Sequence, residues 1–130
     1  MIKRLIVALV AMMSINLSMA EEVPIDYVNY IELKPILVNY GGPGKSRFIK
    51  AEVTIQVSTP AAHHAINFHM PHIRNDLVFF LTDQTLEAVG AIDAQQNLSK
   101  QALKIVQNIL VEEEGEAFVS DLFFTSFITQ

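Results

Sequence analysis

The feature that most constrains the fold of this chain is a stretch of strict alternation from Phe48 to Ser58. The even positions from Lys50 to Ser58 are polar or charged, and the odd positions between them are apolar: Ile49, Ala51, Val53, Ile55 and Val57. Because successive side chains of a strand point to opposite faces, the pattern predicts a β-strand with one buried and one polar face. Such a strand needs a covering layer on its apolar face only.

The cover is predicted to come from the helical stretch that follows, Pro60 to Leu81. Thr59 suits the N-cap, and Pro60 fits the first helical position, where its missing N–H costs nothing. An inward stripe repeats at three- and four-residue spacing: Met70, Ile73, Leu77 and Leu81. Pro71 interrupts this stretch, so either the helix kinks there or His69 ends one helix and Pro71 starts a second.

Three further segments complete the predicted fold. Tyr30 to Asn39 reads as a first strand, which Pro35 confines to a sheet edge or kinks, and residues 41–46 form a turn. Ala94 to Glu112 is the clearest helix, and Gly115 ends it; Phe118 to Thr129 is a last strand of strong β-formers. The order predicts an α+β domain, an antiparallel sheet of about three or more strands with helices packed on one face.

The first twenty residues have the layout of a secretory signal. Lys3 and Arg4 precede an apolar run, and the segment closes with Ser18-Met19-Ala20. The run is shorter than the roughly 20 residues that span a bilayer. We therefore predict a cleaved signal over residues 1–20, a leader over 21–28 and a folded periplasmic domain over 29–130; the alternative is a short uncleaved anchor.

Composition excludes several classes of function. The chain has no cysteine, so disulfides and thiolate metal sites are absent, and a net charge of −5 disfavours nucleic-acid binding. The Gly44-Lys45-Ser46 triplet resembles the end of a phosphate-binding loop, but Asn39 stands where that motif needs glycine. No Gly-x-Ser-x-Gly elbow or carboxylate pair is recognisable. We predict neither an enzyme nor a cofactor.

Two clusters of titratable residues stand out. His69, His72 and Asp76 share a face of a regular helix, which could hold a zinc ion or a ligand; the alternative is a solvated polar face, or one that senses pH. Glu113 and Glu114 belong to an acidic run at a helix C-terminus, either a solvated turn or a docking point for a basic partner.

The last strand is apolar on both faces if it alternates regularly. Val119, Phe123 and Phe127 would then point one way, and Leu122, Phe124 and Ile128 the other. A sheet with helices on one side buries only one set, which leaves Phe124 on an exposed apolar patch. The pattern predicts a homo-oligomer that covers this patch, or alternatively a leader folded over it.

Four local patterns together resemble the flagellar basal-body-associated FliL family. They are Leu33-x-Pro35-x-x-Val38-Asn39, Arg47-Phe48-x-Lys50, Met70-Pro71-x-Ile73-Arg74 and Phe123-Phe124-Thr125-x-Phe127-x-x-Gln130. The resemblance covers about residues 29 to 130, and the C-terminal pattern is its most specific part.

This resemblance implies a fold, a location and a function. Family members are single-pass inner-membrane proteins whose periplasmic domain is similar to the stomatin-type (SPFH) fold. They assemble as a ring around the stator units of the flagellar motor and support rotation and swarming, without enzymatic activity. The implied function is therefore a non-enzymatic motor accessory with stator or basal-body partners. A short signal-like segment stands here where the family has a long membrane helix, so the domain is expected in the periplasm, free or attached to the inner membrane. The alternative is a soluble periplasmic metal- or ligand-binding protein that uses the His69, His72 and Asp76 face.

Overall fold

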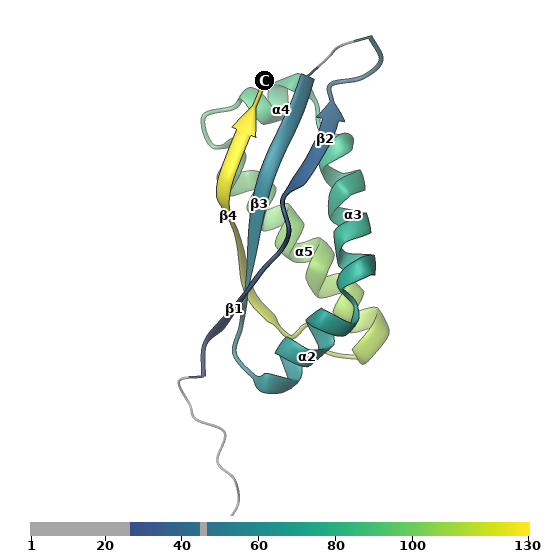
Figure 1. Ribbon diagram of the computed structural model, residues 1–130, viewed down its shortest axis with the longest axis vertical. Helices are drawn as coiled ribbons and strands as arrows, with labels where there is room; N and C mark the ends of the chain where they lie inside the picture. Colours follow the sequence, from purple (N-terminus) through teal and green to yellow (C-terminus); the bar gives the residue numbers. More distant parts are fainter. Residues whose placement is uncertain (1–26, 45–46) are drawn as a thin grey trace, which may run out of the picture.

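A computed structural model describes residues 27–44 and 47–130 as an antiparallel sheet with helices packed against it (Figure 1). The strands are β1 (Asn29–Glu32), β2 (Ile36–Tyr40), β3 (Arg47–Val57) and β4 (Val119–Thr129). The helices are α2 (Pro60–Phe68), α3 (Met70–Thr82), α4 (Leu86–Gly90) and α5 (Ala94–Glu114). This arrangement confirms the predicted α+β class, while the stomatin-type label stays a prediction. The signal and most of the leader lie outside the described residues.

Strand β3 is the centre of the sheet, as its alternation predicts. Strand β4 pairs along one of its edges, and β1 and β2 share the other. The five apolar side chains at odd positions of β3 are at most 2 % exposed and form the floor of the core. The inward stripes of α3 and α5 pack on this floor, with Ile73, Leu77, Val106 and Leu110 among the fully buried side chains of the core.

The predicted first strand is divided into β1 and β2 by a bulge. Glu32 pairs with Thr54 and Ile36 with Ala51, so the three residues 33–35 oppose only residues 52 and 53. The extra residue reverses the alternation. The buried residues are at odd positions up to Leu33 (Ile31 and Leu33) and at even positions from Ile36 onward (Ile36, Val38 and Tyr40). Pro35 sits at this interruption, where a missing N–H does not break the ladder.

The helical stretch after β3 is two helices, which decides between the two alternatives for Pro71. Helix α2 ends at Phe68, His69 lies between the helices, and α3 starts at Met70 with Pro71 in its first turn. The Thr59 hydroxyl accepts a hydrogen bond from the Ala62 amide at 3.1 Å, which confirms the predicted N-cap.

Helix α5 runs from Ala94 to Glu114 and ends where the sequence predicts. Gly115 has a φ of 80°, the left-handed conformation that glycine adopts without steric cost at a helix C-terminus. The three residues before it are all glutamates, and α5 has no basic residue in its last turn. This helix end therefore lacks a cation of its own to offset its dipole.

Strand β4 carries two bulges, and they make the predicted register of this strand wrong. Its pairing with β3 shifts between Gln56 and Val57 and again between Glu52 and Val53, so Ser120 and Thr125 are the extra residues. Both hydroxyls donate to carbonyl oxygens of β3, from Ser120 to Gln56 at 3.0 Å and from Thr125 to Glu52 at 3.4 Å. Each bulge reverses the faces of the residues beyond it.

The corrected register puts a different set of residues on the core side. Leu122, Phe124 and Phe127 pair with Ile55, Val53 and Ala51, whose side chains are buried in the core. Leu122 is 2 % exposed, and Phe124 and Phe127 are partly buried against the core, with their rings 5.1 Å apart. Ile128 and Phe123 instead share the open face with Lys50 and Thr54. Phe124 therefore does not belong to an exposed patch.

Candidate functional site

The bulge between β1 and β2 is tied to α3 by one arginine. The Arg74 guanidinium donates to the backbone carbonyl oxygens of Lys34 and Pro35, the latter at 2.7 Å. These carbonyls lie in the bulge, where they are free to accept from outside the sheet. The partners of this guanidinium are thus backbone carbonyl oxygens and not acidic side chains. A planar fork with several fixed donors suits two neighbouring acceptors.

This tie joins two of the four sequence patterns that were recognised separately. Leu33 and Pro35 come from one pattern, and Pro71 and Arg74 from another, nearly forty residues later. A groove of about 630 Å³ lies beside the tie, between the bulge and the junction of α2 with α3. Its lining combines buried Ile31 and Leu33 with three charged residues, Glu32, Lys34 and Arg74.

The remaining pattern residues lie at the other end of the sheet and along β4. Asn39 pairs with Phe48, and Arg47 with Tyr40, at the hairpin between β2 and β3. The backbone of Gln130 exchanges two hydrogen bonds with Phe48, at 2.9 and 3.0 Å, and so extends the ladder of β4. Thr125 is the extra residue of one β4 bulge, and Phe127 packs against the core. These roles are structural positions and do not converge on one site.

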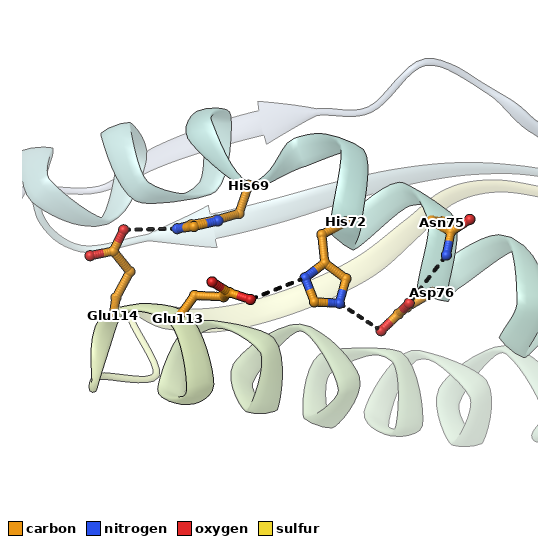
Figure 2. A network of polar contacts seen from close by, with 6 residues as sticks. All are labelled: His69, His72, Asn75, Asp76, Glu113 and Glu114. Carbon is orange, nitrogen blue, oxygen red and sulfur yellow. Dashed lines mark hydrogen bonds and ion pairs between the residues drawn. The ribbon is translucent and has the colours of Figure 1, made fainter.

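Two histidines at the start of α3, His69 and His72, face two glutamates at the end of α5 (Figure 2). His69 Nε2 lies 2.8 Å from Glu114 Oε1. His72 places its two ring nitrogens toward two carboxylates, Nδ1 at 3.7 Å from Glu113 and Nε2 at 3.4 Å from Asp76. The sequence showed the histidines and the glutamates as two unrelated clusters; the fold brings them face to face.

The network does not have the geometry of a metal site. Within the ranges 27–44 and 47–130, no three histidine or acidic side chains converge to hold an ion. His69 lies in the break between the helices and turns to Glu114, while His72 and Asp76 lie within α3. The spacing argument for a shared face required a regular helix through all three residues. Because the helix is broken at His69, the three side chains do not meet.

The open face of the sheet carries three of the exposed large apolar side chains. Tyr30, Leu37 and Ile128 are 54 %, 67 % and 49 % exposed, and the Tyr30 ring makes an edge contact with Phe123 at 6.2 Å between centroids. Of the set that regular alternation predicts to be exposed, Ile128 lies on this face, whereas Leu122 and Phe124 pack toward the core.

The comparisons with known proteins decide the family. The model of the family described as flagellar basal body-associated protein FliL matches residues 30–130. The chain belongs to the FliL family. The match extends over all the strands and helices of the described fold, apart from the first residue of β1.

The chain is also similar to a named flagellar protein. The flagellar protein LafL of Vibrio parahaemolyticus serotype O3:K6 (strain RIMD 2210633) is 26% identical over 101 residues, which cover 75% of this chain and 59% of that protein. The chain thus spans about 59% of that relative's length. Among the helices that the structure describes, none is long and apolar enough to cross a membrane.

Proposed function

We propose that this FliL-family domain is a non-enzymatic accessory of the flagellar motor that supports stator function, rotation and swarming through protein contacts. The match of the family over residues 30–130 carries the proposal, because it covers the folded domain and not an isolated motif. The relative described as a flagellar protein supports it. The absence of a recognisable catalytic arrangement in the sequence fits a role in contacts.

The proposed location is the periplasm, free or attached to the inner membrane at the flagellar basal body. The proposed partners are stator or basal-body proteins and further copies of the chain, arranged in a ring. The exposed side chains of Tyr30, Leu37 and Ile128 on the open sheet face support an assembled state, in which a partner would cover them. Glu113 and Glu114 are not proposed as a docking point, because both face histidines of the same chain.

The test is deletion and complementation in a flagellated host that carries this gene. We expect deletion to reduce swarming while flagella are still assembled, and the wild-type gene to restore it. Cross-linking in the complemented strain should recover stator or basal-body proteins, together with second copies of the chain. Unchanged swarming, or cross-links to neither group of motor proteins, would contradict the proposal.

A separate prediction concerns the N-terminal signal. We expect cleavage after Ala20, because Ser18-Met19-Ala20 offers small residues at the positions that a signal peptidase reads. Mass spectrometry of the periplasmic fraction should show a chain that begins at Glu21. An intact N-terminus in the membrane fraction would instead establish the uncleaved anchor.

A further inference from the structure

The ladder around the middle of β3 is interrupted on both sides at the same level. The bulge between β1 and β2 opposes residues 52 and 53, and the Thr125 bulge of β4 falls between Glu52 and Val53. Bulges bend a strand locally and re-aim its side chains. A pocket of about 390 Å³ lies at this level. Its lining includes Glu32, Glu52 and Thr54 of the open face, so this bulge pocket opens on that face.

Two carboxylates line the bulge pocket without a cation from their own chain. Glu32 and Glu52 are exposed, and among the residues that the structure describes the three ion pairs involve neither of them. Lys50 lies two residues along β3 on the same face and takes part in none of these pairs. Asp121, which pairs with Gln56, adds a further carboxylate to this face. The charge of the pocket and its surroundings therefore suits a basic group.

Thr54 indicates a ligand independently of the carboxylates. It is polar, it is only 4 % exposed, and it lines the bulge pocket. In the described part of the chain, its hydroxyl has no hydrogen-bond partner, and no polar side-chain atom is both unpaired and sealed from solvent. The hydroxyl is therefore reached through the pocket. It can accept a hydrogen bond as well as donate one, so it adds an oxygen acceptor beside the two carboxylates.

An aromatic pair lies next to these acceptors on the same face. Phe123 pairs with Thr54 across the sheet, and its ring makes an edge contact with the ring of Tyr30 at 6.2 Å between centroids. Tyr30 is 54 % exposed and lies two residues before Glu32 on β1. A guanidinium binds carboxylates through its planar fork and also stacks on aromatic rings, whereas an ammonium lacks the fork. The combination matches the chemistry of arginine.

We infer that the bulge pocket receives an arginine side chain of another motor protein. Its volume of about 390 Å³ is far above the roughly 30 Å³ that one water occupies, so a whole side chain has room. A bare cation such as Ca²⁺ is less well suited. It takes about six to eight oxygens, and no three histidine or acidic side chains converge anywhere in the described chain.

A second copy of the chain is disfavoured as the partner at this face. Two copies that met through their open faces would bring Glu32, Glu52 and Asp121 of one against the same carboxylates of the other, and like charges oppose such a contact. That the partner is a motor protein rests on the proposed function. The preference for arginine does not, because it follows from the lining of the pocket.

The test of the chemistry is a nuclear magnetic resonance titration of the isotope-labelled full chain. The probe is the capped tripeptide Gly-Arg-Gly, and its control is the same peptide with citrulline, which has nearly the shape of arginine but no charge. We expect the arginine probe to shift the amide signals of residues 32–35, 52–54 and 123–125, and the citrulline probe to leave them in place. Raising the ionic strength to about 1 M should weaken the binding, because salt screens exposed ion pairs.

A pair of matched variants locates the binding. Glu32→Gln/Glu52→Gln removes both charges and keeps the shape of the side chains. It should weaken binding of the arginine probe by about tenfold, since each exposed ion pair contributes up to about fivefold. Glu112→Gln/Glu116→Gln removes the same charge from exposed positions at the end of α5 and should leave binding unchanged. In the complemented strain, only the first variant should lower the recovery of cross-linked motor proteins.

Several results would overturn the inference. They are equal binding of the citrulline probe, full binding by the Glu32→Gln/Glu52→Gln variant, and unchanged cross-links in the strain that carries it. The same shifts caused by Ca²⁺ alone would indicate an ion site instead, and shifts caused by concentrating the chain would indicate a second copy. The titration contains no motor protein, so its failure would leave the proposed function intact. Unchanged swarming after deletion would in turn leave the titration result intact.

Discussion

Replacing Val53 by aspartate should leave the domain largely unfolded. Val53 lies at the middle of the buried face of β3, is 2 % exposed and pairs with Phe124 on the core side. The new carboxylate would have to give up its hydration in the core without a partner, at a cost of several kcal/mol. A domain of this size has a total stability of about 5–15 kcal/mol. Circular dichroism during thermal unfolding should show a large loss of the native signal or a strongly lowered midpoint.

The matched control is Leu37→Asp. It makes the same kind of change in the same sheet, but on the open face, where Leu37 is 67 % exposed. We expect an effect within about 0.5 kcal/mol, as for other surface substitutions. Thr54 is not a suitable control, although it also lies on the open face, because it is only 4 % exposed. Similar melting curves for the Val53 and Leu37 variants would show that the two faces of the sheet are wrongly assigned.

The second large effect is expected from Arg74→Ala, which removes the tie between α3 and the bulge. Hydrogen bonds from a charged donor contribute about 1.5–3 kcal/mol, and both Lys34 and Pro35 lose their side-chain donor. Arg74→Lys should recover only part of the loss, because a lysine keeps the charge but lacks the planar fork. Urea unfolding followed by circular dichroism measures both differences.

Lys100→Ala is the control for the loss of a positive charge, since Lys100 is exposed on α5. It should leave the unfolding midpoint nearly unchanged. If the Arg74→Ala variant were as stable as the wild type, the tie would have no structural role. Loss of swarming from such a fully stable variant would then indicate direct contact of Arg74 with a motor partner.

Local signals predicted a large part of this fold. The period of two predicted which face of β3 is buried. Thr59 and Pro60 predicted the start of α2, and Gly115 predicted the end of α5. In each case the deciding interaction lies within a few residues of the signal. The break at Pro71 was left with two alternatives, because a proline alone does not say whether a helix bends or ends.

The sequence analysis did not predict the bulges, although the spacing of apolar residues departs from a period of two at each of them. The core-facing residues of β4 are buried Val119 and Leu122 and partly buried Phe124 and Phe127, a spacing that a regular strand cannot produce. The residues inserted there, Ser120 and Thr125, are both hydroxyl residues that can satisfy a carbonyl left unpaired by a bulge. In the first strand, the buried set changes from odd to even positions across Lys34 and Pro35. Assuming a regular period led directly to the wrong place for Phe124.

The histidine network could not have been assembled from the sequence. His69 and Glu114 are separated by 45 residues, and their meeting depends on how α3 packs on α5. Before the fold was known, the histidines suggested a site on one helix and the glutamates an unrelated acidic turn. The Arg74 contact with the bulge, across 39 residues, was hidden for the same reason.

The two bulges of β4 have a consequence for how copies of this protein can crowd together. Strand β4 is 11 residues long and rich in phenylalanine, and it pairs with β3 alone among the described strands. A long, flat edge strand of that kind can pair with a strand of another chain, and such pairing leads to aggregation. Ser120 and Thr125 interrupt the regular row of backbone donors and acceptors and increase the local twist. Another chain could therefore not extend the sheet along the whole of β4, and this edge resists growth into a continuous β-structure.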